Sequence, residues 1–411
     1  MRYFCFMIRW IIFIAVILAI DFYAFQSLKT ITKNKITFAV YWLLSLAILA
    51  NFTYRLATFN SAHGFPQTLM LAFGLLILSI IPKIFALLIL FGEDIFRVAK
   101  SVFNYFSSTP SNQYFPERRA FVSKMALGLA AIPFMSVLYG MARGKYNYQV
   151  INHTLYFDDL PEAFDGFKLT HISDIHCGSF DDAEKIMAGI DLINEQKSDI
   201  ILFTGDLVNN LADEMIPWIG HFSKLKAEFG KYSILGNHDY GEYVRFNSDE
   251  EKAQNFQAIK ELHPQIGFNL LLNDSVYVEK GADKIALVGV ENWGTRFKKA
   301  GNLNVASSKI NKEDFKILMS HDPSHWNAEI KKHQSNFQLT LSGHTHGMQF
   351  GIEIPGFKWS PVQYVYEQWA GIYEAFGKYI NVNRGFGFLA FPGRVGIWPE
   401  ITVITLKKKQ V

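Results

Sequence analysis

The first third of the chain alternates long apolar runs with short polar connections. A helix needs about 20 apolar residues to cross the hydrocarbon core of a bilayer. Four runs meet this length, at about Phe4–Phe25, Ile36–Phe52, Thr68–Phe91 and Phe121–Met141. Pro82 and Lys83 interrupt the third run, and we expect Lys83 to face protein or to reach toward the interface. The pattern predicts a transmembrane helical region of about four spans over residues 1–145.

From Tyr146 onward, short apolar runs alternate with amphipathic stretches. Strand-like runs occur at 167–173, 199–205, 231–236, 284–290, 315–320, 337–341, 379–383 and 400–406. Helical patterns occur at 181–196, 213–228 and 249–263. This alternation predicts an α/β domain over residues 146–411, with sheets covered by helices.

Charge divides the chain at the same place. Residues 1–145 carry 14 Lys/Arg and 4 Asp/Glu, a net charge of +10, whereas the other 266 residues carry 26 and 33, a net charge of −7. Nucleic-acid backbones favour a basic footprint, so an acidic domain disfavours a nuclease and no nucleic-acid partner is expected. The two cysteines, Cys5 and Cys177, lie in different parts of the chain and predict no disulfide framework.

Lys and Arg in the connections between apolar runs predict the orientation in the membrane. With four spans, the first and third connections share one side of the membrane. Seven basic residues fall on that side and five on the other, which favours placing the seven in the cytoplasm and the C-terminal domain outside the cell (inner) membrane. The seven are Lys29, Lys33, Lys35, Arg97, Lys100, Arg118 and Arg119; the five are Arg2, Arg9, Arg55, Arg143 and Lys145.

The segment Glu117–Ala131 has paired arginines before an apolar run, the pattern of a twin-arginine export signal. It lies inside the chain rather than at the N-terminus. Two interpretations stay open: an orientation signal or its relic, and ordinary juxtamembrane charge.

Polar residues with metal-binding chemistry follow five of the strand-like runs. Loops at the ends of strands open on one edge of an α/β sheet, so their side chains are expected to converge. The five groups are Asp174 with His176; Asp206; Asn237 with His238 and Asp239; His321; and His344 with His346.

The imidazoles of His344 and His346 stand one residue apart between glycines. In an extended chain they would point the same way. Carboxylate and amide oxygens together with imidazole nitrogens suit Mn, Fe or Zn better than Ca or Mg. Two divalent ions at roughly 3.5–4 Å need a bridging group, and the carboxylate of Asp206 is the natural candidate.

The series D-x-H, G-D, G-N-H-D, H and G-H-x-H resembles that of the calcineurin-like metallophosphoesterases, and the membrane-anchored bacterial branch looks closest. The resemblance covers about residues 165–410. It implies a four-layer sandwich, two mixed sheets flanked by helices, with two divalent metal ions between strand ends. Met348 departs from the branch, which often has a second glycine after G-H-T-H, and leaves substrate choice open.

The resemblance also implies roles for single residues. One metal ion would be bound by Asp174, His176, Asp206 and His346, and the second by Asp206, Asn237, His321 and His344. His238 would face the scissile phosphate, and Asp239 would orient His238. The implied reaction is hydrolysis by metal-activated water.

These observations predict a membrane-anchored phosphoesterase acting on a phosphodiester or pyrophosphate, on the hypothesis that the substrate is a lipid or envelope intermediate. The alternative is a membrane sensor or scaffold that binds metal without turnover. Several further residues near the motifs are expected to be structural or to pack: His171, His325, His333 and Cys177. For Arg384 and Arg394, phosphate binding and ordinary ion pairing are equally weighted.

Overall fold

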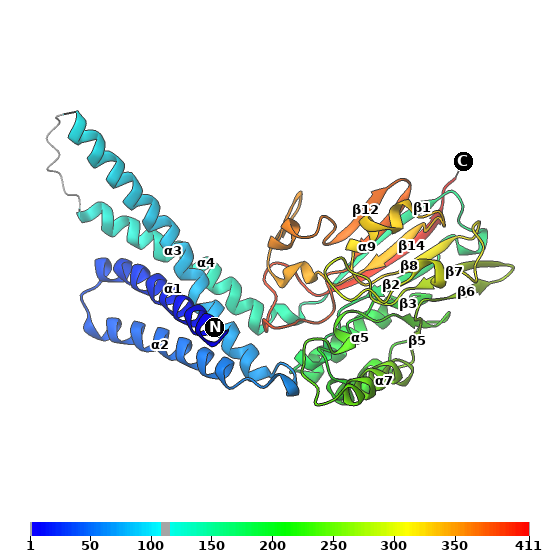
Figure 1. The fold of residues 1–411 in the computed structure, drawn as a ribbon. Helices are drawn as coiled ribbons and strands as arrows, with labels where there is room; N and C mark the ends of the chain where they lie inside the picture. Colours follow the sequence, from blue (N-terminus) through cyan, green and yellow to red (C-terminus); the bar gives the residue numbers. More distant parts are fainter. Residues whose placement is uncertain (1, 108–115, 411) are drawn as a thin grey trace. The chain divides into compact units, whose positions relative to one another are not determined.

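The computed structural model describes residues 2–107 and 116–410, and it divides the chain into two compact units (Figure 1). The first, the helical unit, comprises Met1–Phe59 and Thr68–Tyr139. The second, the sheet unit, comprises Asn60–Gln67 and Gly140–Val411. The short segment Asn60–Gln67 therefore belongs to the sheet unit although the helices enclose it in the sequence.

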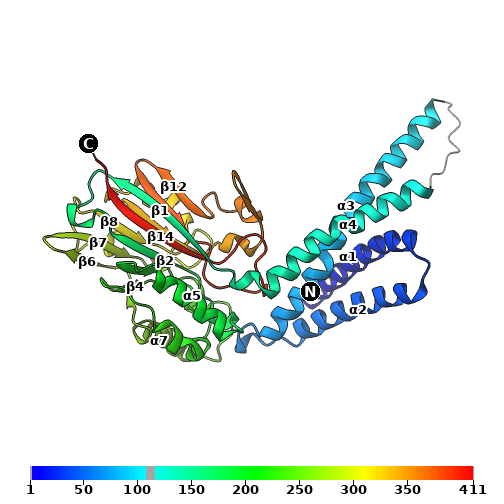
Figure 2. The same ribbon diagram turned by 180° about the vertical axis from the view of Figure 1, so that it is seen from behind.

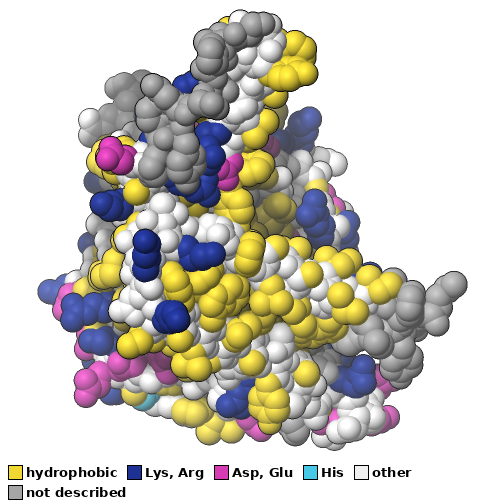
Figure 3. All heavy atoms as spheres, turned by 90° about the vertical axis from the view of Figure 1, so that its left-hand side faces the viewer, with side chains coloured by type: hydrophobic (Ala, Val, Ile, Leu, Met, Phe, Trp, Pro, Cys, Tyr) yellow, Lys and Arg dark blue, Asp and Glu magenta, His cyan; other side chains and the backbone are white. Residues whose placement is uncertain are grey.

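Four long apolar helices form the front of the chain: α1 (Arg2–Ile31), α2 (Lys35–Ala57), α3 (Gln67–Phe106) and α4 (Pro116–Ala142). All four contain stretches long and apolar enough to cross a membrane, which confirms the predicted membrane region. Hydrophobic side chains remain exposed over these helices (Figure 3), as lipid contact requires. At 40 residues α3 is about 60 Å long and continues through Pro82, so the third run is one helix rather than two.

An ion pair is buried among the first three helices. Lys83 of α3 donates to Asp21 of α1 at 2.5 Å, to Ser45 of α2 at 2.8 Å and to Ser79 of α3 at 2.7 Å. The side chains of Lys83 and Asp21 are 14% and 3% exposed. The ammonium group thus has three acceptors for its three protons, and Lys83 faces protein as expected.

The paired arginines at the start of α4 bind acidic residues of α3. Arg119 lies 2.9 Å from the Asp94 carboxylate, and Arg118 lies 3.8 Å from that of Glu93. Tyr23 of α1 donates to the same Asp94 at 2.6 Å. Of the two interpretations of this segment, the ion pairs favour ordinary structural charge.

The sheet unit contains two six-stranded mixed sheets. The first has the order β1 (Gln149–Phe157), β14 (Glu400–Lys408), β2 (Lys168–Ile172), β3 (Ile200–Phe203), β4 (Lys231–Ser233), β5 (Asn269–Leu270). The second has the order β12 (Gly371–Ala375), β13 (Lys378–Val382), β9 (Leu339–Ser342), β8 (Lys316–Met319), β7 (Asp283–Gly289), β6 (Asp274–Lys280). Strands β2, β3 and β4 are parallel, as are β7, β8 and β9.

The two sheets pack face to face through a hydrophobic core. Leu169 and Leu202 of the first sheet belong to one buried cluster with Leu287, Ile317 and Leu339 of the second. Every residue of β3, β8 and β9 is buried, which explains the continuous apolar sequence of β3 and the mostly apolar sequence of β8.

Helices cover the outer faces, so the unit has the four layers that the sequence predicted. On the first sheet lie α5 (Ala183–Glu195) and α7 (Asp249–Gln265), and His263 of α7 bonds Ser233 of β4 at 2.8 Å. On the second lie α8 (Leu303–Ala306) and α9 (Ser324–Ala328), whose Leu303 and Trp326 share a buried cluster with β7 and β8.

Local predictions failed where no apolar period guided them. The helix expected at 213–228 is a 3₁₀ segment, Ala212–Trp218, with Pro217 inside it, followed by the four-residue α6 (Ile219–Phe222). Proline removes a helical donor and clashes with the preceding turn, so an α-helix does not form there. Strands β1, β5, β6 and β12 of the two sheets were also missed.

The connection between α2 and α3 packs on the sheet unit. The side-chain amide of Gln67 donates to the carbonyl of Phe180 at 2.7 Å, and the amide of Arg245 donates to the carbonyl of Ser61 at 3.4 Å. These contacts lie within the sheet unit, and they are consistent with two spans, α3 and α4, between the second connection and the sheets.

Replacing Lys83 by Met should destabilise the helical unit by about 3–5 kcal/mol, because Asp21 is left buried and charged without a partner. The double variant Asp21→Leu/Lys83→Met should recover most of that loss. Thermal unfolding of the full chain in detergent measures both. Equal losses in the single and double variants would show that the charge pairing is not what the bundle requires.

Candidate metal centre

The candidate residues converge where strands of both sheets end. Strands β2, β3 and β4 of the first sheet lead into Asp174 and His176, Asp206, and the Asn237–Asp239 segment. Strands β8 and β9 of the second sheet lead into His321 and into the loop that carries His344 and His346. Five separate chain segments thus deliver their side chains to one place between the sheets.

The backbone at the site is turned into the left-handed region. Residues other than glycine rarely adopt it, and each instance costs of the order of 1–3 kcal/mol. The φ angles are 51° at Asp174, 48° at His176, 59° at Asp206, 70° at His344 and 50° at His346. The expectation of an extended His344–His346 segment was therefore wrong, and the two rings point into different groups of ligands.

One group of potential ligands comprises Asp174, His176 and His346, all buried, whose ligand atoms lie within 4.8 Å of one another. His346 Nε2 lies 3.3 Å from Asp174 Oδ1, and His176 Nε2 lies 3.4 Å from Asp206 Oδ2. Neither Nε2 has a hydrogen-bond partner. A buried nitrogen without a partner carries a desolvation cost that a metal ion removes.

A second group is built around Asp206. His321 Nε2 lies 3.1 Å from Asp206 Oδ2 and 3.2 Å from Asn237 Oδ1, and His344 Nδ1 lies 2.8 Å from Asn237 Oδ1. His321 Nδ1 donates to the carbonyl of Thr204 at 2.7 Å, which leaves the lone pair of Nε2 directed at this group. Ligands at 2.0–2.2 Å from one ion stand about 3 Å apart, so these spacings fit a divalent metal.

Two glycines allow the ligand loops to approach. A Cβ on Gly343 would lie 1.8 Å from Ser173 Oγ and 2.2 Å from Asp174 Oδ2, and one on Gly236 would lie 2.2 Å from Asp206 Oδ1. In the space that Gly343 leaves, the amide of His344 donates to Asp174 Oδ2 at 2.9 Å. The glycines of G-H-T-H and G-N-H-D thus serve close packing.

His238 lies at the edge of both groups. One ring nitrogen of His238, one of His176 and a carboxylate oxygen of Asp206 lie within 4.8 Å of one another. Its Nδ1 donates to the carbonyl of Asn209 at 2.7 Å, and its ring centroid lies 4.4 Å from that of Tyr243. Burial lowers the pKa of His238 to about 4, so the ring is neutral near pH 7.

The structure gives Asp239 hydrogen-bond partners other than the His238 ring that it was expected to orient. Both carboxylate oxygens of Asp239 accept backbone N–H groups instead, from Asp206 at 2.9 Å, Leu207 at 2.8 Å, Val208 at 3.3 Å and Gly236 at 2.8 Å. The backbone carbonyl of Asn209 holds His238. Asp239 therefore fixes the loops that follow β3 and β4.

The electrostatics of the site favour positive charge beside Asp206. The pKa of His321 is raised to about 10, because the carboxylate of Asp206 outweighs the burial that would lower it. The pKa of Asp206 lies well below its usual range, since its histidine neighbours outweigh its burial. Burial and the charge of Asp206 raise the pKa of Asp239 to about 7. A divalent cation at Asp206 would replace the positive charge of His321, so it would favour ionised carboxylates and a neutral His321 with a free Nε2 lone pair.

Tyr366 contacts the site and was not predicted. Its hydroxyl lies 2.9 Å from His344 Nε2 and 3.4 Å from Asp322 Oδ2. Tyr366 lies in an aromatic stretch with no motif, whereas Asp322 directly follows His321 and the sequence could have drawn attention to it. The ring of Phe297 packs edge-on against His344, with centroids 4.6 Å apart.

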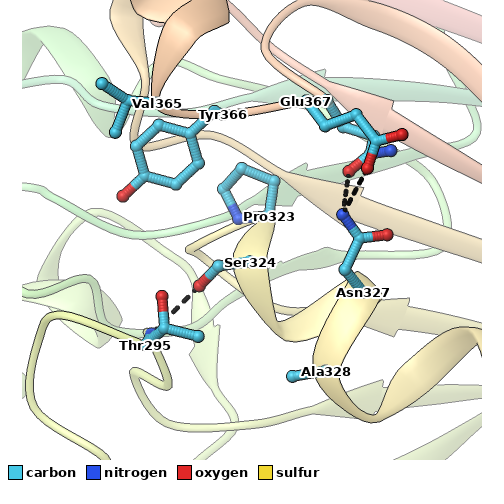
Figure 4. A pocket seen from close by; sticks show the side chains of 9 residues that line it. Thr295, Pro323, Ser324, Asn327, Ala328, Val365, Tyr366 and Glu367 are labelled. Atoms are coloured by element: carbon cyan, nitrogen blue, oxygen red, sulfur yellow. Dashed lines mark hydrogen bonds between the residues drawn. The ribbon is translucent and has the colours of Figure 1, made fainter.

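Tyr366 also lines a pocket of about 290 Å³ (Figure 4). Asn327 crosses one wall and donates to Glu367 at 3.1 Å and to Gln368 at 2.7 Å. No Lys or Arg belongs to the lining, which consists of Thr295, Pro323, Ser324, Asn327, Ala328, Val365, Tyr366, Glu367 and Gln368.

Both arginines that were weighed as phosphate ligands are buried and bound to protein groups. Arg384 pairs with Glu400 and Glu353, and Arg394 donates to the carbonyl of Gly387 at 2.5 Å. Ion pairing thus accounts for Arg384 and backbone hydrogen bonding for Arg394. Met348 is 52% exposed with φ of 54°, a conformation that suits the glycine common at this position.

The other residues near the motifs are structural. His171 is buried between Thr204 and Asn381, and His325 stacks on Trp293 with ring centroids 4.3 Å apart. Cys177 is fully buried, which raises the pKa of its thiol well above the usual range and suits packing rather than nucleophilic chemistry.

Two protein families match the chain. Residues 8–145 match the family described as probable calcineurin-like phosphoesterase, transmembrane domain, and residues 167–348 match calcineurin-like phosphoesterase. The Bacillus subtilis metallophosphoesterase YkuE is 33% identical over 279 residues, which cover 66% of this chain and 90% of that protein. The chain belongs to the calcineurin-like phosphoesterases.

Other relatives of this phosphoesterase are named for the same catalytic domain, and one of them is also named a transmembrane protein. A transmembrane protein with metallophosphoesterase domain from Danio rerio is 26% identical over 66% of this chain and 60% of its own length. A metallophosphoesterase from Aquifex aeolicus is 27% identical over 67% of this chain and 99% of its own length. The protein is thus a membrane-associated, metal-dependent phosphoesterase.

Replacing Asp239 by Asn should lower the stability of this phosphoesterase by about 3 kcal/mol or more, because an acceptor of four buried backbone donors loses its charge. Replacing His238 by Ala should change stability by less than about 1 kcal/mol, since its ring makes one backbone hydrogen bond. Thermal unfolding followed by tryptophan fluorescence reports mainly on the sheet unit, which holds six of the eight tryptophans. Similar melting temperatures for both variants would show that Asp239 does not stabilise the loops that follow β3 and β4.

Proposed function

We propose that the chain hydrolyses a phosphodiester or pyrophosphate bond at a centre of two divalent metal ions, Mn, Fe or Zn. The observation that carries the proposal is the position of Asp206, whose Oδ2 lies 3.4 Å from His176 Nε2 and 3.1 Å from His321 Nε2. One carboxylate is thus shared by two groups of ligands, as a bridged pair of ions requires.

Seven residues would bind the ions in this proposal. Asp174, His176, Asp206 and His346 would hold the first ion, and Asp206, Asn237, His321 and His344 the second. When bound, divalent ions supply positive charge that polarises phosphoryl oxygens and acidifies water. Tyr366 keeps His344 Nε2 engaged, so that Nδ1 faces the centre.

His238 is the group that meets the substrate. Its Nδ1–H donates to the carbonyl of Asn209 at 2.7 Å, so in the neutral ring Nε2 is a proton acceptor that faces the site. After Nε2 has taken up a proton, it can donate to a phosphoryl oxygen or to the departing oxygen. Tyr243 packs against the ring and keeps it in place. Asp239 does not contact the substrate in this proposal; it is a positioning residue that fixes the backbone of Asp206 and Gly236.

The pocket beside Tyr366 supports a choice of substrate. It offers hydroxyl, amide and carboxylate groups and no cationic side chain in its lining. Such a wall suits an uncharged, hydroxyl-bearing leaving group rather than a second phosphate group. This favours a diester of a polyol or sugar over a pyrophosphate.

The membrane region supports a substrate that is itself lipid-linked, and the excess of basic residues in the first and third connections supports a sheet unit outside the inner membrane. The second connection packs on the sheet unit through Gln67 and Ser61. These contacts are consistent with four spans in either orientation of the chain in the membrane.

The test is hydrolysis of a chromogenic diester and monoester by the full chain in detergent, with Mn²⁺, beside Asp206→Asn. The parent should prefer the diester, and Asp206→Asn should lower kcat/KM by about 100-fold or more. Metal content by elemental analysis should fall from two ions per chain. The matched control Asp322→Asn alters a carboxylate that contacts Tyr366 but lies outside the ligand set, and should keep both ions.

Three results would contradict the proposal. A parent that binds two ions without hydrolysing any ester would favour a metal-binding sensor or scaffold. Full activity in Asp206→Asn would remove the shared carboxylate from the mechanism. Preference for the monoester would overturn the assignment of the pocket to a leaving group.

A further inference from the structure

A small hairpin stands apart from the two sheets. Strands β10 (Ile352–Ile354) and β11 (Phe357–Trp359) pair only with each other, and Pro355 and Gly356 form the turn between them. The hairpin projects from the sheet unit in both ribbon views (Figures 1 and 2). Residues directly opposite in such a pair share a face, and side chains alternate between faces. One face thus carries Ile352, Ile354, Phe357 and Trp359.

The other face of the hairpin is charged and turned toward the sheet unit. Glu353 accepts from Arg384 at 2.6 Å, and Arg384 is buried. Lys358 donates to the carbonyl of Ala370 at 2.5 Å and lies 4.9 Å from the ring centroid of Trp369. The two polar residues therefore anchor the hairpin to the sheet unit, although both remain exposed.

The opposite face is hydrophobic and is exposed as well, which is unusual for a hairpin on an aqueous surface. Ile352, Ile354 and Phe357 are 50%, 58% and 51% exposed. Exposed Met348, Tyr364 and Val365 extend the same stretch of chain. We call these six residues and Trp359 the hairpin patch.

Aromatic residues in the hairpin patch have the chemistry of a membrane–water interface. Trp359 Nε1 donates to the hydroxyl of Tyr364 at 3.4 Å. Trp and Tyr are enriched at that depth because a large apolar ring and a polar group occupy one side chain. Trp359 and Tyr364 lie in the same patch as the exposed side chains of Ile352, Ile354 and Phe357. This composition suits a membrane–water interface better than water alone.

The base of the hairpin is linked to the end of the fourth span through two consecutive residues, Arg394 and Val395. Gly140, in the last turn of α4 but part of the sheet unit, accepts from the amide of Arg394 at 3.2 Å. The next residue, Val395, donates to Gln349 at 2.8 Å and accepts from Gly351 at 2.9 Å. Two strand spacings, about 10 Å, thus separate the last turn of α4 from the hairpin base.

The end of α4 lies at the bilayer surface, because its 26-residue apolar stretch is about 39 Å long and the hydrocarbon core is about 30 Å thick. We propose that the hairpin patch inserts into the headgroup region of the phospholipid bilayer that holds the chain's own helices. The occupant of this surface is therefore lipid, brought near by the chain itself.

The insertion has a consequence for access to the metal centre, and this consequence rests on the proposed function. His346 begins the 3₁₀ segment η8 (His346–Gln349), which ends three residues before β10. Ser360, after β11, donates to the carbonyl of Gly347 at 2.8 Å. A phosphoester carried by a bilayer lipid would meet the centre at the membrane surface, without leaving the bilayer.

The direct test places a fluorescent nitrobenzoxadiazole probe on Phe357→Cys in the full chain, with Cys5 replaced by Ser and Cys177 buried. The chain is reconstituted into phosphatidylcholine–phosphatidylglycerol vesicles. The matched control carries the probe on Phe376→Cys, which is 71% exposed between β12 and β13 of the same unit. Nitroxide-labelled lipids should quench the Phe357 probe strongly and the Phe376 probe weakly, and aqueous iodide should do the reverse.

Two outcomes of the quenching test would overturn the insertion. Iodide quenching of the Phe357 probe that equals that of the control would place the hairpin in water. Protection of the Phe357 probe from both quenchers would show that protein, such as a second copy of the chain, covers the patch.

A second arm measures hydrolysis of a vesicle-borne phosphodiester lipid and of a soluble chromogenic diester. Ile354→Glu/Phe357→Glu should lower the first rate by about tenfold or more and leave the second within about twofold. The control Val305→Glu, at a 54% exposed position on α8, should change neither. An unchanged rate on the vesicle-borne lipid would overturn the access role. A parent active only on the soluble diester would remove the lipid substrate from the proposed function, and the quenching result alone then decides where the hairpin lies.

Discussion

The carboxylate of Asp239 fixes two backbone loops of the candidate metal centre. It accepts four backbone N–H groups from two loops, those of Asp206, Leu207 and Val208 after β3 and that of Gly236 after β4. The amide of His238 in turn donates to Asp206 Oδ1 at 2.8 Å. The residue that would bridge two ions and the residue that would face the substrate are therefore placed by the same set of hydrogen bonds.

This constraint is needed because the site is built from strained backbone. Five ligand residues have left-handed φ angles, from 48° to 70°. Such conformations persist only where the surroundings over-determine them. Here the surroundings are the hydrogen bonds of Asp239, the close approach at Gly343 and a core shared by both sheets. The same interactions therefore determine both the stability of the fold and the geometry of the candidate metal centre.

The chain uses polarity differently in water and in lipid. Among the helices, a fully bonded Lys83–Asp21 pair is buried while apolar side chains face outward. The β10–β11 hairpin resembles this arrangement in part, because Glu353 and Lys358 bond to the sheet unit while the hydrophobic residues of the opposite face are exposed. In the two sheets the order is the ordinary one, with apolar residues between layers. Contact with the lipid bilayer, as proposed for the hairpin, would explain the exposed apolar side chains of both the helices and the hairpin.

The sequence by itself determined the four apolar helices, the α/β alternation and the candidate ligands, because each of these is local. A span needs only a run of apolar residues, and D-x-H or G-H-x-H places its side chains at the end of an adjacent strand. Tertiary structure alone decided that Asp239 holds backbone instead of His238, that Tyr366 bonds His344 and that Arg384 is buried against Glu353 and Glu400. The outward face of the hairpin was decided in the same way, by inward anchors that are up to 31 residues away in the sequence. Such contacts depend on which loops the two sheets bring together, and no period or motif in the chain encodes that meeting.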